Sequence, residues 1–334
     1  YSSASVDRVK NPFNIKLNYL IEGQDHQGID KIKLSNVIQD PSFLREVLSY
    51  QIARKYMPAS ESNFANVYVN DTLLGLYSNV EAVNNEFLEK HFTTADNVLV
   101  KGSPETVDLY GENSNLSQTP GMDSLAYTLL YSMRSDYGWT ALYNFIDTLN
   151  NHEADIDKVL NVDQALWLHA LNYTLINFDS YVGYAQNYYL YQDKAGRFNP
   201  IIWDLNMSLG SFRLTDASVY FDGFSIEQAK TLDPLSHYNE FSVFPRPLLR
   251  KLFNTTRYRK MYLAHIRTIV QENISNQAYL TRAETLHQLI DESVQNDVNK
   301  FYTYADFQNN LYGTVSDFID YPGIVDLMEG RAAY

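Results

Sequence analysis

The chain has 334 residues, of which 45% are hydrophobic and 20% are charged. This length allows about two domains or one large unit with two lobes, and the hydrophobic content is enough for a buried core, so global disorder is excluded. The formal net charge of −14, from 26 Lys and Arg against 40 Asp and Glu, repels phosphate groups and disfavours a general binder of nucleic acid or of an anionic membrane surface.

Two absences limit the chemistry that this chain can carry out. It contains no cysteine, which excludes disulfide frameworks, zinc–thiolate sites, cysteine nucleophiles and iron–sulfur clusters. No apolar run approaches the ~20 residues that a membrane-spanning helix needs, so we expect no membrane span in this chain.

The start at Tyr1 has neither an initiator Met nor an apolar signal core, and we interpret it as that of a mature or trimmed chain. We expect an extracytoplasmic location: secreted, periplasmic or at the cell surface.

The first hundred residues are predicted to form a small lobe of strands and helices. Alternation of apolar and polar residues predicts half-buried strands, whereas the longest helix is predicted from its ends. Asp40 is a suitable N-cap, Pro41 suits the first helical position, and Pro58 stops the helix. The expected elements are strands at 13–20, 31–34, 64–69, 73–83 and 98–101, helices at 40–57 and 85–92, and a hairpin turn at 70–72.

The remaining residues are predicted to form a linker and a larger, mainly helical lobe. From 102 to 123 the sequence is rich in Gly, Ser, Pro, Asn and Thr, which is typical of a linker or mobile loop. Beyond it we expect helices at 124–133, 139–149, 162–178, 246–253, 256–274, 276–300 and 324–333, a β-hairpin at 187–192 and 198–203, and a weakly patterned stretch at 211–245. The expected fold class is α+β, with an N-terminal α/β lobe at 1–101, a linker at 102–123 and a C-terminal lobe at 124–334 that carries a hairpin near 187–204.

The common sequence motifs of nucleotide and metal enzymes are absent. The chain contains no G-x-x-x-x-G-K-[ST], no G-x-G-x-x-G, no H-E-x-x-H and no G-x-S-x-G. Its seven histidines show neither H-x-H nor i,i+4 spacing. A histidine-based metal site would therefore need residues that are far apart in the sequence.

Three oxygen-bearing side chains around the expected hairpin form the best candidate site. Asp179 follows an apolar helix, Asn187 opens the first hairpin strand, and Asp204 ends the second. A hairpin can bring Asn187 and Asp204 together, and Asp179 on the preceding loop can face them. Two carboxylates and an amide suit Mg²⁺ and the orientation of a hydroxyl group. The alternative is that all three are ordinary turn or capping residues, which are often Asp and Asn.

Candidate cations and a further acid lie in the small lobe. Lys16 and Lys33 are on strands that precede the helix bearing Glu46, and protein kinases use a strand Lys paired with a helix Glu to hold nucleotide phosphates. Lys101, after a short apolar strand, is a third candidate for phosphate contact. For any one of these lysines the alternative is a solvent-facing side chain. Glu81, beside apolar residues, is either a functional acid or the partner of an arginine.

Several separated stretches together resemble the CotH kinase family, the atypical secreted kinases named for a bacterial spore-coat protein. They are the run 34–50, Val67–Asn70 with Gly75–Tyr77 and Glu81, Leu99–Lys101, Asn187–Tyr191, Trp203–Gly210 and the closing segment Gly323–Tyr334. These stretches occur in the family's order and span most of the chain. The resemblance implies a protein-kinase-like, two-lobed fold and the use of ATP with Mg²⁺ or Mn²⁺ to phosphorylate Ser or Thr hydroxyls of a protein substrate.

The resemblance also implies roles for individual residues. Asp204 matches the metal-binding Asp of the family's Trp–Asp motif, Asp179 the catalytic-loop Asp, and Asn187 the amide of the second metal site. We expect Lys16 and Lys101 to contact the phosphates and Glu81 to take part in nucleotide binding.

Two departures from the family pattern leave a second interpretation open. Many relatives carry a second Asp two residues after the first, where this chain has Asn206, and the region from 13 to 34 contains only Gly23 and Gly28 instead of a glycine-rich loop. Loss of a carboxylate weakens the attraction for a divalent cation. The alternative is a catalytically inactive, pseudokinase-like module that binds protein or glycan at the cell surface. A metal-dependent hydrolase is disfavoured because the acids have no histidine partner.

Overall fold

The computed structural model describes residues 8–108, 111–118, 124–214, 223–236 and 245–334. The start at 1–7, residues 109–110 and 119–123 of the expected linker, and residues 215–222 and 237–244 of the weakly patterned stretch lie outside this description. Among the helices of the described ranges, none combines the length and the apolar composition needed to cross a membrane.

The first sheet is built from the N-terminal part of the chain and is antiparallel throughout. Its strands are β1 (Phe13–Lys16), β2 (Lys31–Ser35), β3 (Ser62–Val69) and β4 (Thr72–Val80), arranged in the order β1-β2-β4-β3. The turn between β3 and β4 contains Asn70 and Asp71, which both have positive φ. Tight two-residue hairpins favour this conformation, because its twist matches that of the strands.

The second sheet joins residues from both sides of the expected linker. Its strands, in spatial order, are β6 (Tyr131–Met133), β5 (Leu99–Gly102), β7 (Tyr188–Gln192) and β8 (Phe198–Ile202). β7 and β8 form the hairpin that the sequence predicts, and every residue of β8 is buried. Because β5 pairs with β7, with Lys101 opposite Tyr189, the predicted lobe boundary at 101 falls inside this sheet.

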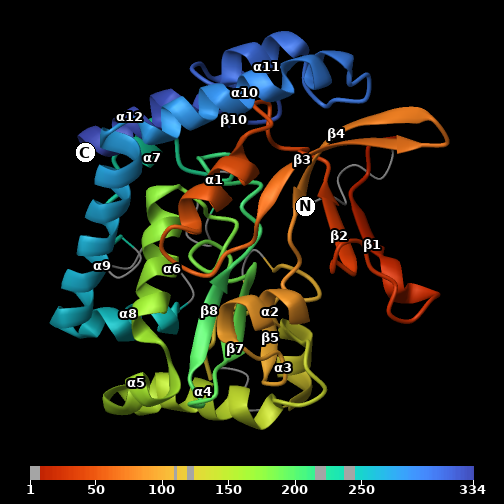
Figure 1. Cartoon of the computed structure of the whole chain (residues 1–334). Helices are drawn as coiled ribbons and strands as arrows, with labels where there is room; N and C mark the ends of the chain where they lie inside the picture. The colour runs from red at the N-terminus through yellow and green to blue at the C-terminus, as the bar shows by residue number, and fades with distance from the viewer. Residues whose placement is uncertain (1–7, 109–110, 119–123, 215–222, 237–244) are drawn as a thin grey trace.

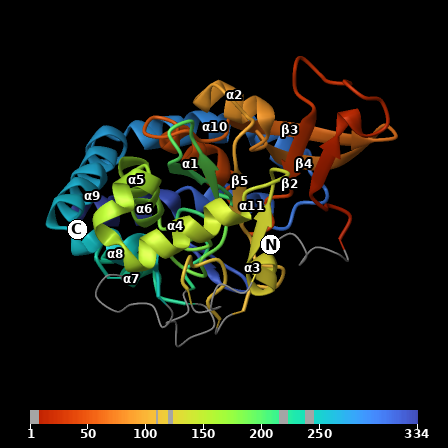
Figure 2. The same ribbon diagram turned by 90° about the horizontal axis from the view of Figure 1, so that it is seen from below.

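Helices surround the second sheet, and α10 runs across the top of Figure 1 above α1. The helices are α1 (Arg45–Ala53), α2 (Asn85–Phe92), α3 (Ser124–Leu130), α4 (Trp139–Asn151), α5 (Ile156–Val159), α6 (Val162–Thr174), α7 (Ile226–Lys230), α8 (Pro247–Asn254), α9 (Thr256–Ile269), α10 (Ala278–Asn296), α11 (Tyr304–Asn310) and α12 (Ile324–Ala333). A π-helical turn, Val270–Ser275, extends α9, and two short strands, β9 (Val315–Ser316) and β10 (Asp320–Tyr321), pair near the C-terminus. Figures 1 and 2 both place the β1–β2 hairpin on the side of the molecule opposite to α8 and α9.

Most of the expected helices and strands are confirmed, with shifts at their ends. The strand expected at 13–20 ends at Lys16, because Leu17–Tyr19 forms a 3-10 turn, and the helix expected at 162–178 ends at Thr174. The helix expected at 124–133 ends at Leu130, where β6 begins. The sequence analysis did not anticipate α5, α7, α11, β6, β9 and β10.

The helix expected to begin at Asp40 begins at Arg45 instead. The Asp40 carboxylate accepts hydrogen bonds from the backbone N–H groups of Ser42 at 3.0 Å and Arg45 at 2.8 Å, which fixes a turn ahead of the helix. Phe43 in this turn has a φ of 61°, a left-handed conformation that does not occur within a regular right-handed helix. The predicted helix at 40–57 is therefore wrong at its ends, and α1 is shorter.

The described part of the expected linker is packed into the protein. Ser114 has no exposed surface. The Tyr188 hydroxyl donates to the Ser114 carbonyl at 2.5 Å, and the Tyr181 hydroxyl donates to the Asn115 carbonyl at 2.9 Å. Residues 111–118 are therefore held in place without regular secondary structure, because tyrosine hydroxyls supply the hydrogen bonds that buried carbonyls need.

The mixed α+β class is confirmed, whereas the two-lobed arrangement stays a prediction. One continuous cluster of buried apolar side chains extends from Val37 to Met328 and includes residues of α1, β5 and α6.

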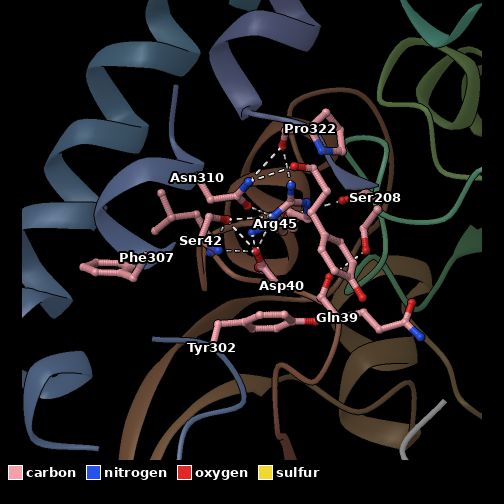
Figure 3. A network of polar contacts seen from close by, with 12 residues as sticks. Gln39, Asp40, Ser42, Arg45, Ser208, Tyr302, Phe307, Asn310 and Pro322 are labelled. Atoms are coloured by element: carbon pink, nitrogen blue, oxygen red, sulfur yellow. Dashed lines mark hydrogen bonds and ion pairs between the residues drawn. The ribbon is translucent and has the colours of Figure 1, made fainter. Parts of the chain in front are cut away.

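A buried arginine joins α1 to the C-terminal part of the chain (Figure 3). Arg45 has no exposed surface and forms an ion pair with Asp40 at 2.5 Å. Its guanidinium also donates to the Asn310 side-chain oxygen at 2.8 Å and to the Pro322 carbonyl at 2.7 Å. Asn310 in turn donates to the Tyr321 carbonyl at 3.0 Å. Because a buried charge is tolerated only when it is paired and hydrogen-bonded, these contacts fix α1 relative to the C-terminal residues.

The same network reaches the segment that follows β8. Ser208 donates to the Arg45 carbonyl at 3.4 Å and shares a hydrogen bond of 2.7 Å with Ser49 of α1. Ser211 donates to the Gln39 carbonyl at 2.6 Å. The start of α1, the segment after β8 and the C-terminal residues are thus held together as one unit (Figure 3).

Replacing Arg45 by Met is expected to destabilise the protein by about 3–5 kcal/mol, because it leaves the Asp40 carboxylate buried without its cation. The free energy of unfolding from urea titration measures this change. The matched control is Lys158→Met, which removes an exposed ion pair with Asp155 and should leave the urea midpoint unchanged. Adding Asp40→Asn to Arg45→Met should recover part of the loss. An Arg45→Met protein as stable as the wild type would contradict the role given to this ion pair.

Candidate active site

A cavity of about 400 Å³ lies between β2, α1, β5 and the segment after β8. Such a volume is within the range of about 300–1,000 Å³ that small-molecule pockets have. Its lining includes five charged residues that come from different parts of the chain: Lys33, Glu46, Lys101, Asp179 and Asp204. Charged residues from β2, α1, β5 and the two loops at Asp179 and Asp204 are therefore brought to one cavity.

Asp204 is placed by a left-handed turn at the end of β8. It has a φ of 61°, a conformation that Asp and Asn adopt more readily than most residues. The Asp204 N–H donates to the Tyr50 hydroxyl of α1 at 3.0 Å, so the turn is fixed to the helix that also bears Glu46. Among the described residues, the Asp204 carboxylate has neither a hydrogen-bond donor nor an ion-pair partner. Its charge is therefore available to a ligand in the cavity.

Asn206 adds an unsatisfied oxygen to the same lining. Its side-chain Oδ1 is buried and, within the described ranges, has no hydrogen-bond partner. Buried polar atoms without partners are rare in folded proteins and call for a specific reason. A ligand that binds the Asn206 oxygen would provide one.

Asp179 lies on the loop after α6 and is 5% exposed. Gln186 donates to its carboxylate Oδ1 at 2.5 Å, and Asn187 donates to its main-chain carbonyl at 3.1 Å. Burial and the charge of Asp204 raise the pKa of the Asp179 carboxyl to about 6. The Gln186 and Asn187 amides favour the ionised form and oppose that rise in pKa.

Lys33 of β2 and Lys101 of β5 bring two positive charges to the cavity. The Lys33 ammonium lies 5.3 Å from the centre of the Trp203 ring, and the Lys101 ammonium 5.8 Å from that of Tyr189, distances at which a ring attracts a cation. Burial lowers the pKa of Lys33 to about 8, and neighbouring lysines add to this effect. Burial also lowers the pKa of Lys101, against the attraction of Asp204. Neither ammonium forms an ion pair with a carboxylate of the described residues.

Glu46 brings a carboxyl group from α1. It accepts a hydrogen bond from the Ser78 hydroxyl of β4. Burial, together with the charge of Asp204, raises the pKa of Glu46 to about 8. In the described part of the chain Glu46 and Lys33 form no ion pair. The strand-lysine and helix-glutamate pair of protein kinases is thus represented by two residues that line one cavity without direct contact.

The cavity brings together several of the residues that the sequence singled out. Asp179, Lys101 and Asp204 line it, and Asn187 lies beside it through its hydrogen bond to Asp179. Lys16 does not line it, because this residue is exposed at the end of β1.

Glu81 also lies outside the cavity. It lines a separate hollow of about 280 Å³ on the first sheet. Its carboxylate accepts the Glu61 N–H at 2.9 Å and pairs with Lys90 of α2 at 3.3 Å. The partner of this acid is therefore a lysine rather than an arginine, and the pair is part of a surface network.

Four residues at the cavity are absent from the roles implied by the family resemblance: Lys33, Glu46, Gln186 and Asn206. The sequence contained a signal for Lys33 and Glu46, because both fit the kinase pattern of a strand lysine and a helix glutamate. It did not distinguish Lys33 from Lys16, since both alternate with apolar residues. Gln186 gave no signal, because a glutamine before a strand has no characteristic spacing.

The residues at the cavity fit ATP with a divalent cation. The carboxylate of Asp204 and the amide oxygens of Asn187 and Asn206 are oxygen donors of the kind that Mg²⁺ prefers, and Lys33 and Lys101 supply cations for phosphate groups. Within the described residues no three Asp, Glu or His side chains converge in a way that could hold a metal ion. A cation here would therefore depend on amide oxygens as well as on carboxylates.

The Glu46→Gln variant is expected to gain stability relative to the wild type as pH rises. A carboxyl whose pKa is higher in the folded than in the unfolded chain lowers stability with rising pH, because the unfolded chain releases its proton first. For Glu46 this loss begins near its ordinary pKa of 4.5 and is complete above its folded pKa of about 8. Urea unfolding at about pH 4 and about pH 9 should show a relative gain of about 2–4 kcal/mol at the higher pH. A stability difference that stays constant with pH would refute this expectation.

Comparison with known protein families identifies the family of this chain. The family model described as CotH kinase protein matches residues 3–325, which includes all the cavity residues named above. No curated protein matched the sequence. Because the family match covers nearly the whole chain, this protein belongs to the CotH kinase family.

Proposed function

We propose that this protein transfers the γ-phosphoryl group of ATP to Ser or Thr hydroxyls of a protein substrate. The observation that supports this most directly is that Lys33, Lys101 and Asp204 surround one cavity without forming ion pairs among the described residues. Unpaired charges inside a protein are costly unless a ligand completes them. A nucleoside triphosphate with its cation carries charges of both signs and would satisfy all three.

Asp204 and Asn187 are the residues that would hold the divalent cation, Mg²⁺ or Mn²⁺, with Asn206 as a further oxygen donor. Asn187 uses Nδ2 to bind the Asp179 carbonyl, which leaves its Oδ1 as the metal-binding atom. When bound, ATP and its cation supply the transferable phosphoryl group and neutralise charge on the phosphates.

Lys33 and Lys101 would hold the phosphates. The pKa of Lys33, lowered by burial to about 8, still leaves most of this side chain protonated at neutral pH. Lys33 takes the place of Lys16 in this proposal, because Lys16 is exposed and outside the cavity lining.

Asp179 would orient the substrate hydroxyl and accept its proton. With a pKa of about 6, its carboxylate is mostly ionised near pH 7 and able to act as a base. The hydroxyl oxygen bonds to the γ-phosphorus, the bond from that phosphorus to the β-phosphate oxygen breaks, and ADP leaves. The hydroxyl proton goes to Asp179.

The substrate class, a partner at the cell surface and an extracytoplasmic location belong to the same proposal. The family membership supports a protein as the phosphate acceptor. The absence of cysteine and the net charge of −14 are compatible with such a location and disfavour nucleic acid as a partner.

One observation favours a second function, a pseudokinase-like module that binds protein or glycan without catalysis. Asn206 occupies the position where many relatives carry a second acid, and among the described residues no three acidic or imidazole side chains are grouped so that they could hold a metal ion. This second function would be favoured if ATP and its cation stabilise the protein but no phosphate is transferred. It would also be favoured if neither stabilisation nor transfer is observed.

Asp204→Ala is expected to reduce phosphate transfer from labelled ATP to a protein substrate by about 100-fold or more, because it removes a carboxylate that would hold the cation. It should also reduce the thermal stabilisation by ATP with Mg²⁺ or Mn²⁺, which for the wild type corresponds to about 2.7 kcal/mol at a ligand concentration of about 100 Kd. Equal labelling by the wild type and the variant would rule out this role of Asp204.

Lys33→Met and Lys101→Met are each expected to weaken ATP binding by about tenfold, because each removes one charge-assisted contact to phosphate, a contact worth about 1.5–3 kcal/mol. Lys16→Met is the matched control and should bind ATP like the wild type. Titration of ATP against the thermal midpoint provides the measurement. Loss of binding in Lys16→Met alone would assign the phosphate contact to Lys16 instead.

A further inference from the structure

Gln186 lies between two residues with left-handed backbone conformations. Ala185 and Asn187 have φ values of 53° and 57°, which are unfavourable for residues that bear a side chain. Main-chain hydrogen bonds hold this turn: the Ala185 carbonyl accepts the Ser114 N–H at 3.0 Å, and the Asn187 N–H donates to the Gly102 carbonyl at 2.9 Å. The end of β5 and the packed segment at 111–118 thus fix the turn from two sides.

This turn directs two consecutive amide side chains at Asp179. Gln186 Nε2 donates to the carboxylate Oδ1 at 2.5 Å, and Asn187 Nδ2 donates to the main-chain carbonyl at 3.1 Å. Gln186 is 7% exposed, so water competes little for its hydrogen bond. A carboxylate can accept about four hydrogen bonds, and the bond from Gln186 therefore leaves Asp179 able to accept one from a substrate hydroxyl.

We infer that Gln186 is a positioning residue for phosphoryl transfer, an inference that rests on the function proposed above. The carboxyl group of an aspartate has a broad range of orientations about its last side-chain bond unless a neighbour fixes it. The hydrogen bond from Gln186 restricts that rotation in Asp179. A displacement of about 1 Å in a reacting group can reduce a rate about 100-fold, so a fixed orientation of the base has a direct effect on the rate.

Gln186→Met tests this inference, because methionine has a similar length and no N–H donor. We expect kcat to fall about 10–100-fold, with the KM for ATP changed by less than about twofold, because Gln186 would not touch the nucleotide. Gln186→Leu, which has a similar volume and no hydrogen-bond donor, should show the same fall in kcat with little change in KM.

The matched control is Gln164→Met. Gln164 is a buried glutamine of α6 that donates from Nε2 to the Pro200 carbonyl at 2.7 Å, and it does not line the cavity. Its replacement removes a comparable hydrogen bond and should lower the thermal midpoint about as much as Gln186→Met. We expect its kcat and its KM for ATP to remain those of the wild type.

The results separate this inference from the proposed function. A wild-type kcat in Gln186→Met would overturn the inference and leave the proposed function standing, as would equal losses of kcat in the Gln186 and Gln164 variants. Absence of transfer by the wild-type protein would overturn the proposed function, and the inference with it.

Discussion

The ion pair between Arg45 and Asp40 is the interaction on which the geometry of the cavity depends. Through Asn310 the guanidinium connects two parts of the chain that are 265 residues apart, and through its own helix it sets the position of Glu46 and Tyr50. The Tyr50 hydroxyl accepts the Asp204 N–H, so the same helix also fixes the turn that presents the cavity carboxylate. The C-terminal residues thus influence the cavity through α1 without lining it. Separating the two partners of a buried ion pair strongly destabilises a protein. A shift of α1 that separated Arg45 from Asp40 is therefore unfavourable.

The charges of the cavity balance without direct contact between opposite charges. Near pH 7 a Glu46 carboxyl with a pKa of about 8 is mostly neutral, so Lys33 and Lys101 face the two carboxylates of Asp179 and Asp204. Glu46 accepts a hydrogen bond from the Ser78 hydroxyl and forms no ion pair with a lysine of the described residues. The raised acid pKa values and the lowered lysine pKa values share one cause, which is burial of charge in a small volume. Because no ion pair joins Lys33, Lys101 or Asp204 among the described residues, their charges can contact a ligand.

The sequence predicted local structure well and long-range contacts poorly. Alternation and turn residues correctly indicated β2, β3, β4 and the β7–β8 hairpin, because these features depend on neighbouring residues. The buried pair of Lys10 with Asp297 joins positions 287 residues apart and left no local signal. The same limit applies to the segment 111–118, whose composition is typical of a loop. Its burial depends on tyrosine hydroxyls from elsewhere in the chain.

The same limit explains which candidate residues could be grouped from the sequence. Asp179, Asn187 and Asp204 could be grouped because they lie within or near one local hairpin, and the structure places them at or beside one cavity. Lys33 could not be distinguished from Lys16, since the difference lies in where β2 sits relative to β5 and the end of β8. The position of Glu81 depends in the same way on a contact outside its own strand, the ion pair with Lys90 of α2.

Turn formation alone accounts for Asn187 more completely than it accounts for Asp204. Both residues have positive φ, and this conformation alone favours Asn or Asp at such positions. For Asn187 the local interpretation goes further, because its Nδ2 satisfies the Asp179 carbonyl. For Asp204 it does not, because asparagine or glycine would form the same turn at least as well, and no group of the described residues pairs with the carboxylate. Turn geometry therefore accounts for the backbone of Asp204 but not for its partly exposed, unpaired carboxylate at the cavity, and a bound cation would account for that charge.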